Sequence, residues 1–248
     1  LVRPTEQFVN RWSQVLNRAK AQPGNPLYVT LVGNSAAGIE LLLAMQQGLH
    51  AAGVTAKLRL IAGSTTLAPQ CAKGVQKRLW AQLRKRQIDI DHGTCTRVTA
   101  DAVQVDGGRT LPSNVTVVAA GASAPEWLNH SGLAQDANGC ALVNTHLQST
   151  SHKNVFATGE VATRLDRPRA QNNAYARRDG TDLALNLLAT LTDQPLSAHA
   201  QSDRALNFIG CGTSHAIASW GGLSAEGTWA WRWKNKIDRD FMARYRRT

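Results

Sequence analysis

The chain has 248 residues, of which 43% are hydrophobic and 18% are charged. This composition can build a sizeable apolar core and excludes a disordered tail, a collagen-like chain and a short disulfide scaffold. Its 28 Lys and Arg residues outnumber its 17 Asp and Glu residues, and the net charge of +11 favours anionic partners such as dinucleotides, polyanions or anionic membrane surfaces.

The cysteines and histidines show no pattern typical of a disulfide framework or a metal site. The four cysteines, which include no C-x-x-C pair, are Cys71, Cys95, Cys140 and Cys211. We therefore expect a reducing, cytoplasmic location and no zinc site. His92 and His215 have no carboxylate or cysteine at ligand spacing, which favours solvated or core histidines. There is no apolar run of about 20 residues and no signal peptide at the start, so a soluble or peripheral protein is expected.

The first part of the chain predicts alternating helices and strands. Apolar spacing predicts a helix over residues 8–19, a strand over 27–32, a helix from residue 39 and a second strand over 56–62. Two strands joined by a helix form a β-α-β unit, and such a crossover implies a parallel sheet.

The middle of the chain predicts a basic amphipathic helix over residues 70–87. The short alternating runs that follow predict a small antiparallel meander; they are residues 88–90, 94–98 and 103–105. The apolar strand 115–120 then returns the chain to the central sheet and ends at Gly121.

Beyond Gly121 the pattern changes. Strands are predicted at residues 141–143 and 154–157, and a helix at 174–191. A tail from residue 196 ends in an aromatic, arginine-rich helix.

The turn after the first strand carries the clearest functional signal. Gly33 and Gly38 occupy the outer positions of a G-x-G-x-x-G dinucleotide turn, and Ser35 takes the middle one. A serine side chain can point aside and hydrogen-bond a phosphate. Residues 62–66, at the end of the second strand, contain neither the acidic residue that favours NAD nor the arginine that favours NADP. The choice between NAD and NADP as the nicotinamide cofactor therefore remains open.

Two other interpretations of this turn remain open. One is an ordinary β-α turn that binds nothing. The other is a nucleophile elbow of the G-x-S-x-G type with Ser35 as a hydrolase nucleophile, although Ala37 stands at the last position.

Four segments then share their motifs and order with a known family. They are residues 29–40, 117–121, 154–162 and 175–180. On these segments the chain resembles the FAD-dependent pyridine nucleotide-disulfide oxidoreductases, and within them the NADH dehydrogenase-like branch. The third segment is the most specific, because A-T-G-D-x-A is a flavin-site signature from which this chain differs at Glu160. The tail over residues 221–234 is similar to flavoprotein modules fused to selenide, water dikinase.

The resemblance implies an α/β fold. It comprises a Rossmann-like FAD/NAD(P)-binding domain with a small antiparallel meander, a partial FAD domain and a C-terminal α+β interface segment. The implied domains are a linker helix over 1–24, the NAD(P)-binding domain over 25–123, the C-terminal half of the FAD-binding domain over 124–195, and a dimerisation or membrane-contact segment over 196–248.

The resemblance also implies the cofactors, FAD with NAD or NADP, and their binding residues. Those implied for the nicotinamide cofactor are Gly33, Ser35 and Gly38 at the pyrophosphate, Asn34 and Ala36 in the same turn, Glu40 near the nicotinamide as the catalytic candidate, and Gly121 on the far wall. Those implied for the flavin are Gly159, Glu160 and Ala176. Glu160 would accept a hydrogen bond from the ribitol, and the helix that begins near Ala176 would direct its positive end at the isoalloxazine. From the residues alone, Glu40 is equally an N-terminal helix carboxylate favoured by the dipole.

The implied activity is hydride transfer from the nicotinamide to the flavin, followed by electron delivery to a quinone or another acceptor. The first glycine turn of the family, which binds the ADP part of FAD, has no counterpart before Gly33. We therefore expect a missing N-terminal FAD-binding half as a partner. The competing hypothesis is a non-catalytic dinucleotide-binding or dimerisation module. A homodimer is a further expected assembly.

The last predicted helix carries an apolar stripe that recurs every four residues. The stripe comprises Trp233, Ile237, Phe241 and Tyr245. It fits packing on its own domain, a partner, or peripheral contact with the inner membrane. No nucleic-acid module is recognisable, so no nucleic-acid partner is expected.

Overall fold

The structure, a computed structural model, describes residues 5–21, 24–119, 124–168, 173–200 and 205–245. The chain divides into two compact units. Unit 1 is residues 1–121 with 207–248, and unit 2 is residues 122–206.

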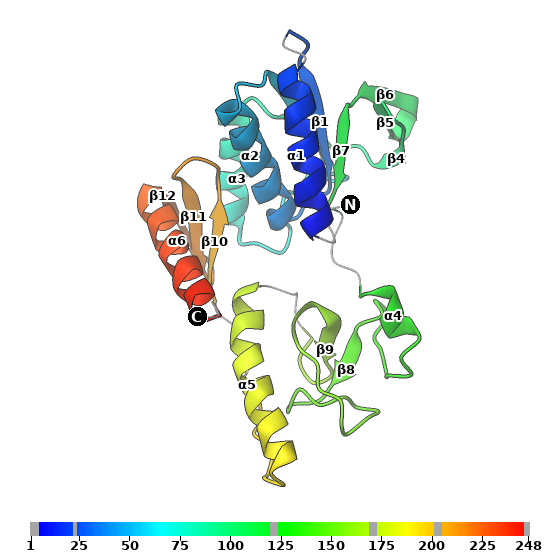
Figure 1. Cartoon of the computed structure of the whole chain (residues 1–248), viewed down its shortest axis with the longest axis vertical. Helices are drawn as coiled ribbons and strands as arrows, with labels where there is room; N and C mark the ends of the chain where they lie inside the picture. Colours follow the sequence, from blue (N-terminus) through cyan, green and yellow to red (C-terminus); the bar gives the residue numbers. More distant parts are fainter. Residues whose placement is uncertain (1–4, 22–23, 120–123, 169–172, 201–204, 246–248) are drawn as a thin grey trace. The chain divides into compact units, whose positions relative to one another are not determined.

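Unit 1 contains the alternating helices and strands of the first half together with the C-terminal segment (Figure 1). Its first elements are α1 (Thr5–Ala21), β1 (Leu27–Val32), α2 (Ala36–Ala51), β2 (Ala56–Ile61), α3 (Lys73–Lys85) and β3 (Asp89–Asp91). They are followed by β4 (Cys95–Val98), β5 (Ala102–Val105), β6 (Arg109–Pro112), β7 (Val115–Val118), β10 (Leu206–Gly210), β11 (Ala216–Trp220), β12 (Leu223–Gly227) and α6 (Thr228–Ala243).

The central sheet has the strand order β3-β2-β1-β7, and every neighbouring pair is parallel. This confirms the α/β fold and the predicted parallel sheet. The prediction that residues 88–90 belong to the meander is wrong, because Ile90 pairs with Leu60 in the parallel sheet. The α3 crossover returns the chain in the direction of β2, so the third strand joins the sheet edge in parallel.

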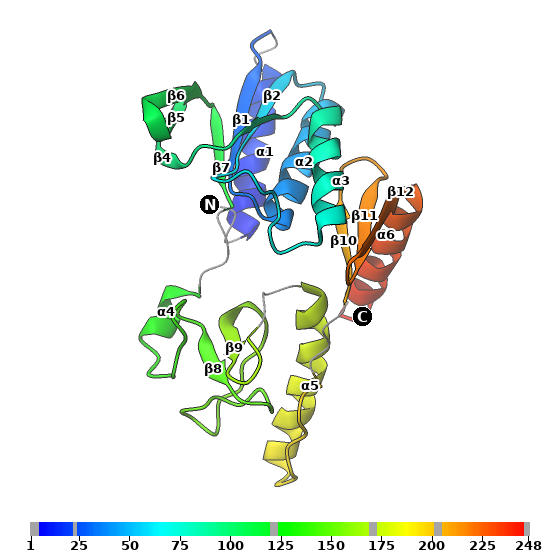
Figure 2. The same ribbon diagram turned by 180° about the vertical axis from the view of Figure 1, so that it is seen from behind.

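The two faces of this sheet are covered differently (Figure 2). Val29 and Leu31 are fully buried in the core formed with the helices, whereas Val32 and Ile61 contact the meander. Successive strand residues point to opposite faces, so one apolar run builds both layers. The N-terminal helix α1 also packs on the main core, through Trp12 among others.

The meander consists of β4, β5 and β6 in antiparallel order. The sequence did not predict β6, whose segment Arg-Thr-Leu-Pro lacks apolar alternation. Arg109 of this strand binds Asp91 of β3 through both guanidinium nitrogens, at 2.8 and 3.0 Å. Hydrogen bonds from Arg109 hold the pKa of the Asp91 carboxyl below its ordinary value. This ion pair ties the meander to the edge of the parallel sheet.

The C-terminal segment folds as a three-stranded antiparallel sheet, β10-β11-β12, followed by α6. The sequence predicted the helix but not the three strands. Ile209, Cys211 and Ile217 are buried in the same core cluster as the central sheet and its helices. The segment is therefore an integral part of unit 1.

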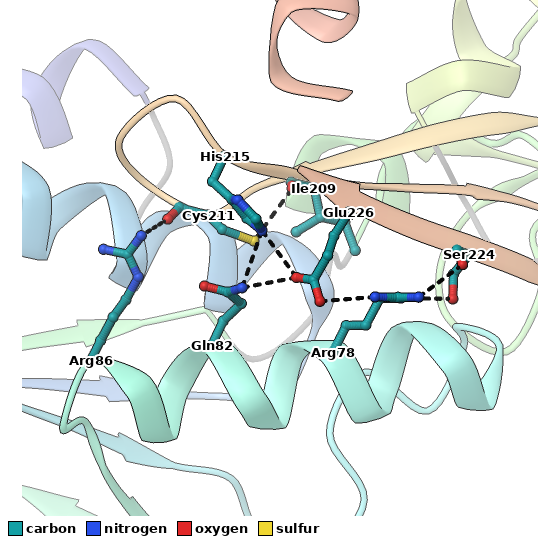
Figure 3. Close-up of polar contacts among 8 residues, drawn as sticks. All are labelled: Arg78, Gln82, Arg86, Ile209, Cys211, His215, Ser224 and Glu226. Atoms are coloured by element: carbon teal, nitrogen blue, oxygen red, sulfur yellow. Dashed lines mark hydrogen bonds and ion pairs between the residues drawn. The ribbon is translucent and has the colours of Figure 1, made fainter. Parts of the chain in front are cut away.

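Polar contacts also join this segment to α3 (Figure 3). Glu226 of β12 receives hydrogen bonds from Arg78 at 2.9 Å and from Gln82 at 2.8 Å, and its Oε2 lies 3.0 Å from His215 Nε2. No carboxylate stands at ligand spacing from His215 in the sequence, but the β11–β12 hairpin brings Glu226 back beside it. Burial would raise the pKa of Glu226, but the hydrogen bonds from His215, Gln82 and Arg78 hold it below its ordinary value.

Unit 2 comprises α4 (Glu126–Asn129), β8 (Ala141–Val143), β9 (Ala162–Arg164) and α5 (Asn173–Leu191), with a 3-10 turn at Gly159–Val161. The strands β8 and β9 pair in parallel. The predicted strand at 154–157 is wrong: Phe156 makes only an isolated bridge to Gln148, and the strand that pairs with β8 begins after the 3-10 turn.

Candidate functional site

The candidate site lies where the strand order of the central sheet reverses. β1 is followed along the chain by β2 on one side, whereas β7 pairs on its other side. At the carboxyl ends, Ala119 N–H donates to the carbonyl of Val32 at 2.8 Å and Gly33 N–H donates to that of Ile61 at 2.9 Å. In open parallel sheets ligands bind outside the carboxyl ends of the strands at such a switch point. Gly121, predicted for the far wall, lies outside the described residues.

The glycine turn occupies this switch point. Gly33 has φ +132°, a conformation that favours glycine and lets the chain turn directly from β1 into α2. Ser35 is the N-cap of α2, and its hydroxyl accepts a hydrogen bond from Gly38 N–H at 3.1 Å. In the part of the chain that the structure describes, the N–H groups of Ala36 and Ala37 have no intrahelical acceptor and remain as donors at the positive end of the helix.

Gly38 brings the first turn of α2 against the sheet. A Cβ at this position would lie 3.2 Å from Ala119 Cβ, 3.3 Å from Ser35 Oγ and 3.4 Å from Leu31 Cδ2. The first two distances are tighter than ordinary van der Waals contact, and the third is at its lower limit. Gly38 thus does what the third glycine of a dinucleotide turn does, which is to allow close packing of helix and strand.

The loop after β2 closes one side of the turn. Asn34 binds it twice: its side chain donates to Thr66 O at 3.3 Å, and its carbonyl accepts from Ala68 N–H at 2.7 Å. Ser64 Oγ also donates to Thr66 O, at 3.0 Å. Asn34 therefore connects the glycine turn to the loop that follows β2, which in this class of fold is where the cofactor ribose is recognised.

Glu40, the catalytic candidate, lies on α2 just beyond the turn and contacts the C-terminal segment. Its Oε1 accepts a hydrogen bond from Gly210 N–H at 2.8 Å and lies 3.7 Å from Lys234 Nζ. Burial raises the pKa of the Glu40 carboxyl, whereas Gly210 N–H and Lys234 lower it, and the net result is a raised value. No local pattern signals these partners, because Gly210 lies 170 residues further along the chain and Lys234 lies further still.

The residues predicted for the flavin lie in unit 2. Gly159 has φ +74° and begins the 3-10 turn that contains Glu160, whose carbonyl accepts from Cys140 Sγ at 3.6 Å. Ala176 lies in the first turn of α5. Thr158 and Asp179 connect the two elements, with Thr158 Oγ1 donating to Asp179 Oδ2 at 3.4 Å.

Sequence reasoning missed a buried histidine between two carboxylates in the same unit. His199 Nε2 lies 3.1 Å from Asp179 Oδ1 and His199 Nδ1 lies 2.5 Å from Asp182 Oδ2. The His199 side chain is 1% exposed. The pair Asp179 and Asp182, three residues apart on a helix, was the available signal, since both face the same side.

The hydrolase interpretation of the turn lacks its catalytic base. Among the hydrogen bonds of the described residues, none joins Ser35 to a histidine, and the Ser35 hydroxyl caps α2. A serine nucleophile needs a base within hydrogen-bond reach. In this structure Ser35 is the helix N-cap at the glycine turn.

The residues present fit a dinucleotide at this turn. The Gly33 conformation, the close approach at Gly38 and the donors at the start of α2 provide a tight turn and an anion-binding helix end. A four-stranded parallel sheet with such a turn at its switch point defines a dinucleotide-binding α/β protein.

The family model for pyridine nucleotide-disulphide oxidoreductases matches residues 9–180. The chain belongs to this family. Proteins of the family are oxidoreductases that bind FAD and use NAD(P)H. Of the helices that the structure describes, none combines the length and the apolar character needed to cross a membrane.

Proposed function

We propose that this chain provides the nicotinamide-binding domain and the second half of the flavin-binding domain of an FAD-dependent NAD(P)H oxidoreductase of the NADH dehydrogenase-like type. The observation that carries the proposal is the Gly33–Ser35–Gly38 turn at the switch point of the parallel sheet. When bound, FAD would accept a hydride from NAD(P)H and pass the electrons to a quinone or another acceptor.

The start of α2 would hold the pyrophosphate. The N–H groups of Ala36 and Ala37, together with the positive end of the helix dipole, attract an anion to this position. Ser35 already accepts from Gly38 N–H, and its hydroxyl hydrogen is still available to a phosphate oxygen. The closely packed Gly38 keeps this helix end near the sheet.

Glu40 would orient the nicotinamide ring. Gly210 N–H donates a hydrogen bond to Oε1 of its carboxylate, and Lys234 forms an ion pair with the same oxygen. An ionised carboxylate has two acceptor oxygens, so Oε2 can accept from the carboxamide N–H₂ group of the nicotinamide. The position of Glu40 on α2, next to the pyrophosphate turn, supports this role.

The flavin half-site would be built from the Thr158–Gly159–Glu160 loop and the start of α5. Unit 2 also has a surface that suits completion by another segment of a flavin domain. Its parallel strands β8 and β9 form a sheet of two, and parallel sheets are normally larger and covered on both faces. On α5, Leu185, Leu188 and Leu191 are 58%, 59% and 83% exposed. We infer that the N-terminal FAD-binding half of the family packs on this apolar surface.

A peripheral membrane contact through α6 is a further part of the proposal. Trp229 and Trp233 are 49% and 46% exposed, and their rings lie 6.4 Å apart. Arg232 and Arg239 are exposed on the same helix. Aromatic side chains beside basic ones are typical of helices that lie in a membrane interface. Sedimentation with anionic vesicles, compared with neutral vesicles, tests this contact.

The experiment for the main proposal measures nucleotide binding and flavin retention. The purified chain is titrated with NADH and NADPH by nucleotide fluorescence. It is also incubated with excess FAD, freed of unbound flavin, and its visible spectrum is recorded before and after addition of each nucleotide. Binding of NADH or NADPH to the chain supports the proposal. If the chain retains flavin, the nucleotide that bleaches the visible absorbance of the flavin is the electron donor.

A charge at the start of α2 provides the matched control. A37D places a carboxylate at the exposed first turn, where it suits the helix dipole but repels a pyrophosphate. A51D makes the same substitution at the exposed far end of α2. We expect A37D to lose nucleotide binding and A51D to retain it. Equal binding by both variants would refute the assignment of the turn.

A further inference from the structure

The C-terminal segment contacts Glu40, the residue proposed for the nicotinamide site. This segment lies beyond the residues that the family model matches, which end at residue 180. β10 and α6 belong to unit 1 with α2, so their contacts lie within one compact unit. Both elements meet α2 at one side chain, Glu40.

The contact from β10 requires glycine at position 210. Gly210 N–H donates to Glu40 Oε1 at 2.8 Å. A Cβ at Gly210 would lie 2.8 Å from the same oxygen, so any other residue would displace the carboxylate. The strand therefore holds the Glu40 side chain by its backbone.

The contact from α6 supplies a positive charge. Lys234 Nζ lies 3.7 Å from Glu40 Oε1 and 2.8 Å from Asp238 Oδ2, one helical turn further along. The side chains of Glu40 and Lys234 are 33% and 28% exposed, so water screens this pair only in part. The other groups that act on the Glu40 carboxyl are Gly210 N–H from β10 and Asp238 from α6, and Asp238 raises its pKa. The neighbouring thiol of Cys211 has a pKa raised by burial to about 12 and is neutral.

We propose that Lys234 is a positioning residue of the nicotinamide site, which with Gly210 holds the Glu40 carboxylate charged and fixed in direction. This inference rests on the proposed role of Glu40 at the nicotinamide. The C-terminal segment then sets nucleotide affinity without contacting the nucleotide. Removal of the Lys234 charge leaves a partly buried carboxylate without its cation, and the carboxylate takes up a proton at higher pH.

The first test is the pH dependence of NADH binding to the full chain, measured by fluorescence between pH 5.5 and 8. In K234M we expect the loss of affinity on the acid side to move to higher pH; on the acid limb of the profile, a shift of one pKa unit corresponds to about tenfold weaker binding at a given pH. K234R keeps the charge and should restore the wild-type profile. K236M removes an exposed lysine of the same helix and should leave the profile unchanged.

The second test needs no nucleotide. The Glu40 carboxyl is titrated by ¹³C NMR, with its resonance assigned from E40Q, in the wild type, K234M and K236M. An upward shift of the Glu40 titration in K234M alone supports the inference, and equal titration in all three proteins overturns it. Thermal unfolding shows whether each variant is folded.

The two tests separate the inference from the function on which it rests. If the wild type binds NADH and K234M has the same profile, Lys234 has no positioning role and the proposed function stands. If the wild type binds neither NADH nor NADPH at any pH, the proposed function fails and the inference fails with it.

Discussion

The substitution of alanine for each of two glycines in α2 tests the close packing at the dinucleotide turn. Gly38 is in the first turn of the helix and Gly48 in the last. Alanine gains about 0.5–1 kcal/mol over glycine in a helix, and less near its ends. At Gly48 the nearest atom to the new Cβ is Trp12 Nε1 at 3.9 Å, an ordinary contact, so G48A should stabilise the protein by up to about 1 kcal/mol.

At Gly38 the same methyl group meets three atoms at 3.2–3.4 Å. Overpacking of this kind typically costs about 1–3 kcal/mol, which exceeds the helix propensity gain. We therefore expect G38A to lower the free energy of unfolding by about 0.5–2 kcal/mol. Because α2 moves away from β7 to accommodate the methyl group, NADH binding should weaken as well.

The assay is urea unfolding followed by tryptophan fluorescence, with linear extrapolation to water. All tryptophans except Trp127 lie in unit 1, so this signal reports mainly on the unit that contains α2. A G38A protein as stable as G48A would refute the argument that helix and strand are in close contact at this turn.

Three further predictions follow from individual contacts. S35A removes the N-cap of α2 and should lower the free energy of unfolding by about 1 kcal/mol in the same urea assay, whereas S35G should cost only a few tenths. The pKa of Glu226 is lowered in the folded state, so its contribution to stability is complete above the ordinary value of 4.5 and is lost as the pH falls below that value. The difference in the free energy of unfolding between wild type and E226Q should therefore become smaller as the pH falls below 4.5. A difference that stays constant down to about pH 3 would contradict this. Cys211 is buried with a pKa raised to about 12, so it should resist a thiol reagent at pH 8 while the half-buried Cys95 reacts, as mapped by mass spectrometry of the labelled peptides.

Local patterns in the sequence were sufficient to predict the first β-α-β unit and its glycine turn. Strand β1 is a short apolar run, α2 has helical spacing, and Gly33 and Gly38 stand at their junction. Each of these signals is carried by residues that are close together in the sequence, so it can be recognised without knowledge of the fold. The parallel sheet followed because a helical crossover leaves few alternatives.

The elements that the sequence predicted wrongly depend on distant partners. The run of residues 88–90 is too short to indicate which strand it pairs with. It pairs with β2 because the α3 crossover places it at that edge of the sheet. The apolar run at 154–157 looks like a strand, yet only Ala162–Arg164 pairs with β8. Period-two patterns show which residues can form a strand but not which strand they will pair with.

The sequence by itself determined the class of the protein, because the turn and the segments around it are contiguous motifs. The tertiary structure alone decided the surroundings of Glu40. Gly210 and Lys234 reach this carboxylate from a hairpin and a helix that carry no dinucleotide motif. Contacts between residues this far apart arise only when the hairpin packs into the core of unit 1, through Ile209 and Ile217. The polarity and charge of the site are therefore a property of packing, which no local pattern records.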